Sequence, residues 1–449
     1  MIQTNAIEHL RVGVGRADIT PPLGTPLTGY PDPDAKRRAE TVRDPLYATA
    51  LVVEQGEHRA ALISIDTCVI DDVYVQRIRE GVTRETGIPS EHVSVCATHS
   101  HSTPRTHTTW GWGEPNEQYA TEQMVPGAIE AVRGAAAQAA PARMGIGTCR
   151  SEAGVNRRPL NEHHRAMLGQ LPWGLTDPQM TVLRFEGADG PIANIVHYGA
   201  HPTVFGGDSR AISRDWPAIL VDRMEQLTGA TTLFVNGAQG DVAPHTGSGR
   251  ASGDGEVALW ETGARAALDA LRTWRGIKEL RDVALGVHAA TFELPYRPLP
   301  SREEATAQLK AAEANKDAAG RGICEFMHWS AVLAAHDEPA CSGKPYMQSL
   351  LALGPVVFVP FPGEPFAELA LRLRAASPFQ HTLAAAVSCG NNGYLWSQEQ
   401  LCRGGYEPWV GRAFGARLLV EHIDDVLVDE NVALLQKLHA QMNPPLPGA

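Results

Sequence analysis

The chain has 449 residues, of which 43% are hydrophobic and 20% are charged, and its formal net charge is −12. This composition is typical of a globular protein, and the negative charge repels nucleic acids and anionic membrane surfaces. We therefore expect no nucleic-acid partner and no stable membrane association.

The N-terminal segment and the cysteines bear on the compartment of the protein. The first residues, MIQTNAIEHLRVGVG, contain no basic segment followed by an apolar one, and the chain has no run of about 18 apolar residues. The seven cysteines include no CxxC pair, which is typical of reduced thiols in a cytosol. No linker-like tract divides the sequence. These features predict a cytoplasmic globular protein with a single domain over residues 1–449.

Short apolar runs alternate with helical stretches, and this alternation predicts an α/β fold with mixed β-sheets flanked by helices. The predicted strands are Tyr47–Val53, Ala60–Ile65, Val93–Ala97, Met180–Phe185, Ile192–Tyr198, Thr232–Val235, Val283–Phe292, Leu353–Pro360 and Thr382–Ser388. The predicted helices are Val73–Thr86, Gln118–Ala139, Trp216–Leu227, Ala258–Thr273, Arg302–Ala335, Pro365–Ala376 and Gly411–Val428.

Several predicted strands run directly into polar loops that are rich in His, Gly or Asn. These loops read ATHSHSTP, HYGAHPTVFGGDSR, NGAQGDVAPH, PGEP and CGNNGY. In α/β proteins catalytic groups collect at strand ends, because the sheet holds them in place while the loops stay accessible. The loops therefore predict a functional site at one edge of the sheets.

His99 and His101 follow the predicted strand Val93–Ala97. Alternate residues of a strand share a face, so we expect both imidazoles to emerge on the same side. Two neutral imidazoles can bind zinc together, or one can bind it while the other serves as an acid or base. The alternative is a pair of loop histidines that only form hydrogen bonds, and the spacing alone does not decide between the two.

Four further residues are ambiguous when they are taken singly. His197 and His201 flank a short turn, and each alone is typical of a hydrogen-bonded structural histidine. Glu364, which precedes a proline, is typical of a helix start. Tyr394 is typical of a half-buried aromatic residue.

Taken together, the motifs resemble the neutral/alkaline, non-lysosomal ceramidase family, and the match runs along the whole chain. VGVGRADITPP resembles the N-terminal strand signature of that family, and ATHSHSTP, GAHPT and NGAQGDVAP resemble three of its loops. PGE recurs between a strand and a helix. Tyr394 and Tyr406 match the spacing of two tyrosines in a C-terminal family segment.

The resemblance implies a ceramidase-like catalytic domain with one zinc ion per chain. The implied zinc ligands are His99, His201, Glu364 and Tyr394, with His101 beside them as an acid and base. Arg157 and Tyr406 would help to polarise the scissile amide, which belongs to a small-molecule substrate.

Three departures from the family pattern bear on mechanism and substrate. Ala243 stands where the family has a serine, so we expect zinc-bound water to be the nucleophile. Trp110 and Trp112 make a bulkier pocket wall than the glycine-rich segment of the family. The sequence ends soon after Tyr406, without the C-terminal β-sandwich domain of secreted members.

These departures predict a substrate that is smaller or more polar than ceramide. Arg157 and Arg158 are candidates to bind a carboxylate on such a substrate. Other interpretations are a zinc esterase or lactonase, a binuclear hydrolase that uses His99, His101 and His197, and an inactive ligand-binding relative. The sequence leaves self-association into a homo-oligomer open.

Overall fold

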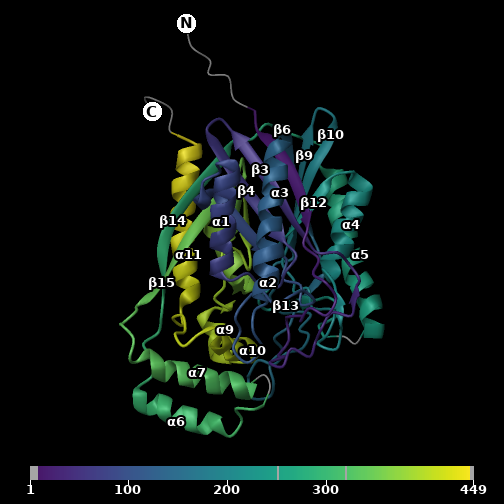
Figure 1. Ribbon diagram of the computed structural model, residues 1–449. Coiled ribbons are helices and arrows are strands. Elements are labelled where there is room, and N and C mark those ends of the chain that lie inside the picture. Colours follow the sequence, from purple (N-terminus) through teal and green to yellow (C-terminus); the bar gives the residue numbers. More distant parts are fainter. Residues whose placement is uncertain (1–8, 250–251, 319–320, 445–449) are drawn as a thin grey trace.

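Three β-sheets form the body of the protein, and helices cover their outer faces (Figure 1). The structure is a computed structural model that describes residues 9–249, 252–318 and 321–444. Each sheet has both parallel and antiparallel neighbours. The predicted α/β fold with mixed sheets flanked by helices is therefore confirmed.

The first sheet has the strand order β5-β4-β3-β1-β6. Both faces of strand β3 are buried. Its residues Ala48, Ala50 and Val52 pack into the core beneath the helices, while Leu51 and Val53 pack toward the other sheets. Side chains alternate between the two faces of a strand, so a sheet covered on both sides is apolar throughout. Its elements are β1 (Arg11–Asp18), β3 (Tyr47–Gln55), β4 (His58–Ile65), β5 (Val93–Ala97), β6 (Ala140–Pro141), α1 (Asp72–Thr86) and α3 (Val125–Ala137).

The second sheet has the order β12-β10-β9-β7, and the third has the order β14-β15-β16-β18. The second comprises β7 (Arg143–Arg150), β9 (Gln179–Gly187), β10 (Gly190–Tyr198) and β12 (Thr231–Asn236), with helices α4 (Trp216–Thr228) and α5 (Ser252–Gly276). The third comprises β14 (Leu285–Pro295), β15 (Gly343–Leu353), β16 (Val356–Pro360) and β18 (His381–Ala385), with helices α8 (Ala367–Ala376) and α11 (Ile423–Met442).

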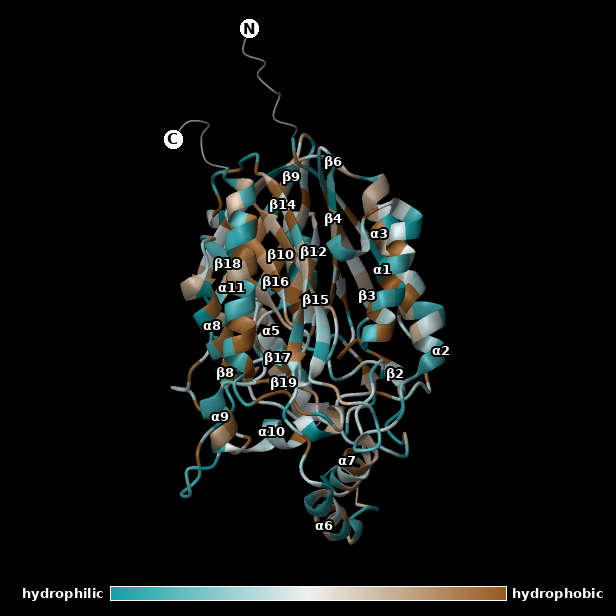
Figure 2. Cartoon of the chain, turned by 90° about the vertical axis from the view of Figure 1, so that its left-hand side faces the viewer, coloured by the Kyte–Doolittle hydropathy of each residue, from teal (hydrophilic) through white to brown (hydrophobic). Residues whose placement is uncertain are grey.

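The three sheets share one apolar core at the centre of the molecule. Leu51 of the first sheet, Leu183 of the second and Phe358 of the third are all fully or almost fully buried in it. The strands that meet there are the apolar middle layer of Figure 2, with helices outside them. Burial of apolar surface is the main force that stabilises such an arrangement, so the sheets form a rigid frame for the loops at their ends.

Loops, short helices and three two-stranded pairs gather at one end of this frame, in the lower half of Figure 2. The pairs are β2 (Thr41–Val42) with β11 (Ala211–Ile212), β8 (Gly154–Asn156) with β13 (Val242–Pro244), and β17 (Glu364–Pro365) with β19 (Tyr394–Leu395). The short helices are α2 (Glu117–Tyr119), α9 (Gln398–Arg403) and α10 (Tyr406–Val410). Within the described residues, no helix is long and apolar enough to cross a membrane.

The predicted helix Arg302–Ala335 is wrong as a single element. It is a hairpin of α6 (Arg302–Glu313) and α7 (Arg321–Ala335) that projects below the body in Figure 1. The two helices pack on each other through Ala305, Trp329 and Val332. One straight helix could not have buried these apolar faces against each other.

The predicted helix Gly411–Val428 is also wrong over its first half. After one turn of 3₁₀ helix at Gly411–Phe414 the chain is irregular, and α11 begins only at Ile423. The intervening backbone pairs with the end of β14: Val420 N donates to Pro295 O at 3.0 Å, and Arg297 N donates to Leu418 O at 2.8 Å. Pairing with a neighbouring segment has overridden the local helical tendency.

The predicted strand Leu353–Pro360 begins too early. Gly354, with φ of 55°, forms with Pro355 the turn between β15 and β16. The strands β1, β7 and β15 were not among the elements predicted from residue patterns. Glycines interrupt the apolar pattern of β7, and Lys344, Pro345 and Gln348 interrupt that of β15.

Candidate metal centre

The loops that follow the parallel strands are held together by backbone and amide contacts. Ala97 N at the end of β5 donates to Val387 O at 3.1 Å, and Ala386 N donates to Asn236 O at 2.9 Å. The buried Asn236 side chain donates to Thr98 O at 3.1 Å and accepts from Ala200 N at 3.3 Å. The ends of β5, β10, β12 and β18 thus meet at one place, as the strand-end argument predicted.

His99 lies in the loop after β5, and its ring orientation is set by a backbone carbonyl. Its Nδ1 lies 2.7 Å from Cys68 O. A carbonyl oxygen only accepts, so Nδ1 carries the proton and Nε2 presents a lone pair. The strand-alternation argument for this residue is wrong, because β5 ends at Ala97 and His99 has φ of 74°. A backbone turn, and not the pleat of a strand, aims the ring.

His201 is oriented in the same way from a second loop. Its Nδ1 lies 2.7 Å from Gln239 O and 3.1 Å from Val242 O, so its Nε2 also presents a lone pair. Its backbone N donates to Val242 O at 3.0 Å, and its carbonyl accepts the indole N–H of Trp216 at 3.0 Å. Hydrogen bonds from the ring nitrogen that does not face the metal, here Nδ1 to Gln239 O and Val242 O, are typical of metal-binding histidines.

Glu364 and Tyr394 are brought side by side by the short parallel pair β17 and β19. They are direct partners in the register of that pair, although 29 residues of chain lie between them. Glu364 N donates to Gly393 O at 2.8 Å, and Asn391 Oδ1 accepts from Gly393 N at 3.0 Å. The turn of asparagine and glycine therefore presents Tyr394 beside Glu364, as expected from the tolerance of these residues for tight turns.

The donor atoms of His99, His201 and Glu364 converge on one point. Glu364 Oε2 lies 3.3 Å from His99 Nε2 and 3.0 Å from His201 Nε2, and the donor atoms of all three residues lie within 4.8 Å of one another. Glu364 Oε2 and His201 Nε2 are buried and have no hydrogen-bond partner. Donor atoms that converge in this way attract a cation, and two imidazoles with a carboxylate form a common zinc donor set. The residues present therefore fit a zinc ion.

The pKa directions agree that this group of residues attracts positive charge. Burial alone would raise the pKa of Glu364, but the neighbouring His99 and His201 hold it well below its ordinary value. Burial alone would lower the pKa of His99, but the Glu364 carboxylate raises it well above the ordinary value. Burial and the charge of Arg157 lower the pKa of His201 to about 4.

His101 lies next to this group but closer to the solvent. Its Nδ1 lies 2.9 Å from Gly29 O, so its Nε2 also presents a lone pair, 3.3 Å from His99 Nε2. Its ring packs edge-on against Tyr30. Burial and the neighbouring histidines hold its pKa well below the ordinary value. The predicted proximity of His99 and His101 is confirmed, although the strand pleat is not its cause.

Arg157 connects Tyr394 to a buried carboxylate that the sequence analysis did not single out. Arg157 Nη2 donates to Tyr394 Oη at 3.0 Å, and its Nε donates to Glu407 Oε1 at 3.0 Å. Burial would lower the pKa of Arg157, but Tyr394 and Glu407 raise it above its ordinary value. Glu407 is only 1% exposed. Arg157 and Glu407 are far apart in the sequence and only the fold brings them together, so no local sequence pattern reveals the pair.

Arg158 also pairs with Glu407 and donates to Gly404 O at 2.7 Å and to Gln400 O at 3.1 Å. Its side chain is only 3% exposed, and its guanidinium group is already hydrogen-bonded to these protein groups. Binding of a substrate carboxylate by Arg158 remains a prediction that none of these contacts supports.

Tyr406 is half-buried and packs between Tyr394 and Trp409. Its ring centroid is 6.3 Å from that of Tyr394 and 5.9 Å from that of Trp409. Burial raises its pKa above the ordinary value, so the hydroxyl stays protonated at neutral pH and can donate.

The two tryptophans of the predicted pocket wall differ in their surroundings. Trp112 is buried in the core of the third sheet. Trp110 lines a surface pocket with Asp71, Lys344 and Phe414. The predicted contact of both residues with substrate stays a prediction.

His197 and Asp241 have structural partners. His197 Nε2 lies 2.8 Å from Ala384 O. Two groups of the described residues could hold a metal ion, and His197 belongs to neither: they are Cys68 with His99 and His101, and His99 with His201 and Glu364. Asp241 Oδ1 accepts from Ala367 N at 2.8 Å, at the start of α8. Burial raises the pKa of Asp241 to about 6. This contact fits the loop-fixing role that the sequence favours for Asp241.

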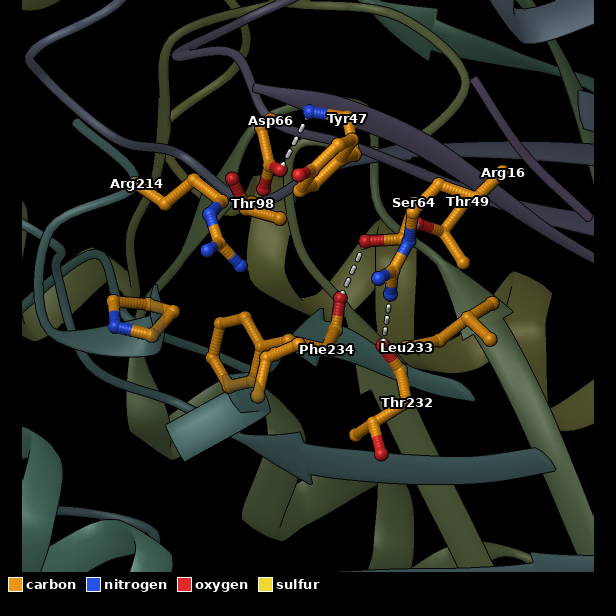
Figure 3. A pocket seen from close by; sticks show the side chains of 12 residues that line it. Arg16, Tyr47, Thr49, Ser64, Asp66, Thr98, Arg214, Thr232, Leu233 and Phe234 are labelled. Carbon is orange, nitrogen blue, oxygen red and sulfur yellow. Dashed lines mark hydrogen bonds between the residues drawn. The ribbon is translucent and has the colours of Figure 1, made fainter. Parts of the chain in front are cut away.

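An enclosed cavity of about 20 Å³ lies between the first and second sheets (Figure 3). Arg16, Asp66 and Arg214 line it, and burial raises the pKa of Asp66 to about 6. This volume holds about one water molecule. None of the predicted site residues lines it, so the cavity is not a substrate site.

Comparisons with known proteins agree with the resemblance found in the sequence. The family model described as neutral/alkaline non-lysosomal ceramidase, N-terminal, matches residues 10–259, which is more than half of the chain. The chain is 26% identical over 217 residues to the neutral ceramidase of Pseudomonas aeruginosa, a match covering 46% of this chain and 32% of that protein. The matched region thus spans about a third of that relative.

Solved structures share the fold. The crystal structure of neutral ceramidase from Pseudomonas aeruginosa superposes with a TM-score of 0.70 at 18% identity, over 96% of this chain and 75% of that one. A ceramidase complexed with C2 superposes with a TM-score of 0.72 at 19% identity, over 96% and 76%. From the match over residues 10–259, this chain belongs to the neutral/alkaline, non-lysosomal ceramidase family.

Proposed function

We propose that this protein hydrolyses the amide bond of an N-acyl compound with the help of one zinc ion per chain. The observation that carries the proposal is the convergence of two imidazole lone pairs and a carboxylate at a buried point. His99, His201, Glu364 and Tyr394 would hold the ion. Membership of the ceramidase family supports the choice of an amide bond.

The ion, when bound, supplies Lewis acidity, which makes water acidic enough to act as a nucleophile near neutral pH and polarises a carbonyl group. The protein supplies proton transfer and orientation. His101 Nε2 is unprotonated and faces the centre, so it can take a proton from the attacking water and return it to the leaving amine. Ala243 is buried in β13 and paired with Val155, so no serine nucleophile is available at that position.

Tyr406 and Arg157 have different tasks in this proposal. The Tyr406 hydroxyl donates to the oxygen that gains negative charge as the carbonyl is attacked. Arg157 is occupied by Tyr394 and Glu407, so it acts by holding the Tyr394 oxygen in place and by adding positive charge behind it. We propose further that the substrate is smaller or more polar than ceramide.

We expect Tyr406→Phe to lower kcat by about 10²-fold, because one donor to the developing oxyanion is lost. KM changes little, since the bond forms mainly in the transition state. Steady-state kinetics on an N-acyl amide measure both constants. Tyr296→Phe, which removes a hydroxyl from a half-buried tyrosine outside the centre, is the matched control. An unchanged kcat in Tyr406→Phe would assign oxyanion binding to other groups.

Metal analysis combined with a substrate panel tests the proposed function. We expect about one zinc per chain, loss of amide hydrolysis after treatment with a chelator, and recovery on addition of zinc. N-acyl amides and the matching esters are compared in the same assay. Two metal ions per chain would favour a binuclear centre, hydrolysis of esters alone an esterase, and zinc binding without hydrolysis of either a ligand-binding role.

A further inference from the structure

An open pocket of about 540 Å³ lies directly beside Tyr406. Arg165, Arg321 and Arg412 line it together with the rings of Tyr406 and Trp409. They come from the loop before β9, the start of α7 and the turn after α10, elements that meet at the lower end of the molecule (Figure 1). We call it the arginine pocket.

The arginine pocket carries more positive than negative charge. Glu325 lies 2.7 Å from Arg412 Nη1 and 3.8 Å from Arg321 Nε, so one carboxylate serves two guanidinium groups. Arg165 Nη1 donates to Cys402 O at 3.2 Å, and no carboxylate of the described residues lies within ion-pair distance of Arg165. This local excess of positive charge stands out in a chain with a net charge of −12.

Two glycines with positive φ lie next to the segment that carries Arg165. Gly404 has φ of 64°, and a Cβ atom there would lie 2.4 Å from Arg165 Nη2. Gly405 has φ of 98°, and a Cβ there would lie 2.9 Å from Ala166 O. The carbonyl of Gly404 also accepts from buried Arg158. The same glycine therefore contacts both Arg165 and the buried network that includes Glu407, and the pocket is built on fixed backbone.

Tyr406 connects the arginine pocket to the metal centre. The proposed ligands are almost completely buried: His99 is 1% exposed, and Glu364 and Tyr394 are each 5% exposed. Tyr406 is half-buried, packs against Tyr394 and forms part of the pocket wall. A substrate whose amide lies beside Tyr406 can therefore place a neighbouring group in the arginine pocket.

We propose that the arginine pocket binds an anionic group of the substrate. The inference rests on the proposed amide hydrolysis and names its substrate class: an N-acyl compound with a negative charge near the scissile amide, of which an N-acyl amino acid is the simplest. Guanidinium groups bind planar carboxylates through paired, charge-assisted hydrogen bonds. The Tyr406 and Trp409 rings offer apolar surface to the part of the substrate between the anion and the amide.

Matched substrates test this inference. N-dodecanoylglycine carries a carboxylate, and N-dodecanoylglycinamide is its neutral counterpart, while N-dodecanoyltaurine carries a sulfonate. We expect the wild-type protein to hydrolyse the two anionic compounds with a kcat/KM at least about tenfold higher than the neutral one. A preference for glycine over taurine would identify the anion as a carboxylate.

Single substitutions connect the preference to the arginine pocket. In Arg165→Gln and Arg321→Gln the ratio of kcat/KM for N-dodecanoylglycine to that for N-dodecanoylglycinamide falls by about tenfold, mainly through KM of the anion. Arg281→Gln, which changes an exposed arginine of the ion pair with Glu279, keeps the wild-type ratio. Added salt lowers the ratio in the wild type and lowers it less in Arg165→Gln, because salt screens exposed charges and one of the three arginines is absent.

The outcomes separate this inference from the proposed function. Equal kcat/KM for the charged and neutral amides in the wild type, with no change in the variants, would overturn the inference and leave amide hydrolysis intact. If no amide is hydrolysed, the proposed function fails. Titration calorimetry with N-dodecanoylglycine then decides the inference alone: tighter binding by the wild type than by Arg165→Gln supports it, and equal binding overturns it.

Discussion

If the proposed function is right, we expect His99→Ala to abolish zinc binding and to lower amide hydrolysis by on the order of a thousandfold or more, because a metal supplies several kcal/mol of transition-state stabilisation. The substitution removes one of three donor atoms that lie within 4.8 Å of one another. Of the proposed ligands that remain, only His201 and Glu364 are of the types common at zinc, and catalytic zinc sites usually have three such ligands. Elemental analysis of the purified variant and steady-state kinetics measure the two effects.

The loss has to be separated from unfolding, because His99 is buried. Circular dichroism and thermal denaturation of the same sample establish whether the fold is retained. His163→Ala, which changes an exposed histidine on a loop, is the matched control and keeps both zinc and activity. A folded His99→Ala protein with full zinc content and full hydrolysis would overturn the proposed ligand set.

Glu407→Gln destabilises the protein by about 3–5 kcal/mol, because it leaves buried cationic groups without their counter-charge. Glu407 is 1% exposed and pairs with both Arg157 and Arg158. The neutral amide keeps the shape of the side chain but not its charge. Urea denaturation monitored by circular dichroism measures the free energy of unfolding, and activity at a temperature where the variant is folded reports whether Tyr394 has shifted.

Glu399→Gln is the control for this prediction, since it removes a carboxylate that is 65% exposed and paired with Arg403 on the same helix. Exposed ion pairs contribute little to stability, so this variant unfolds like the wild type. Equal stability of Glu407→Gln and the wild type would mean that Arg157 and Arg158 find other acceptors when the carboxylate is absent.

Most strands of the frame and the two histidine loops were predictable from residue patterns alone, whereas β1, β7 and β15 were not. Strand β5 was predicted with its observed bounds, and the loops that hold His99 and His201 follow β5 and β10 as expected. The reason is physical: buried strands have continuous apolar sequences, and the loops that follow them carry unusual polar residues. The orientation of His99 was not predictable, since it depends on a backbone turn and on Cys68 O.

Glu364 and Tyr394 required the family resemblance. Each is ordinary in its own segment, and only the parallel pairing of β17 and β19 places them together. Glu407 was missed altogether, because a buried carboxylate becomes recognisable only when the arginines opposite it are known. The hairpin of α6 and α7 was missed because local helix propensity does not report where a helix turns back on its partner.

The pairing of β17 with β19 makes the proposed ligand set depend on strand register. A slip of one residue would place Leu395 beside Glu364 in place of Tyr394, exchanging an oxygen donor for a hydrocarbon and reversing the direction of each side chain. The register depends only on the paired residues themselves. The segment between the two strands, which contains α8 and β18, can change in length at its exposed turns without altering that register. Insertions inside Gly363–Pro365 or Gly393–Leu395 cannot be absorbed in this way. We therefore expect natural relatives to have no insertions or deletions within these two tripeptides.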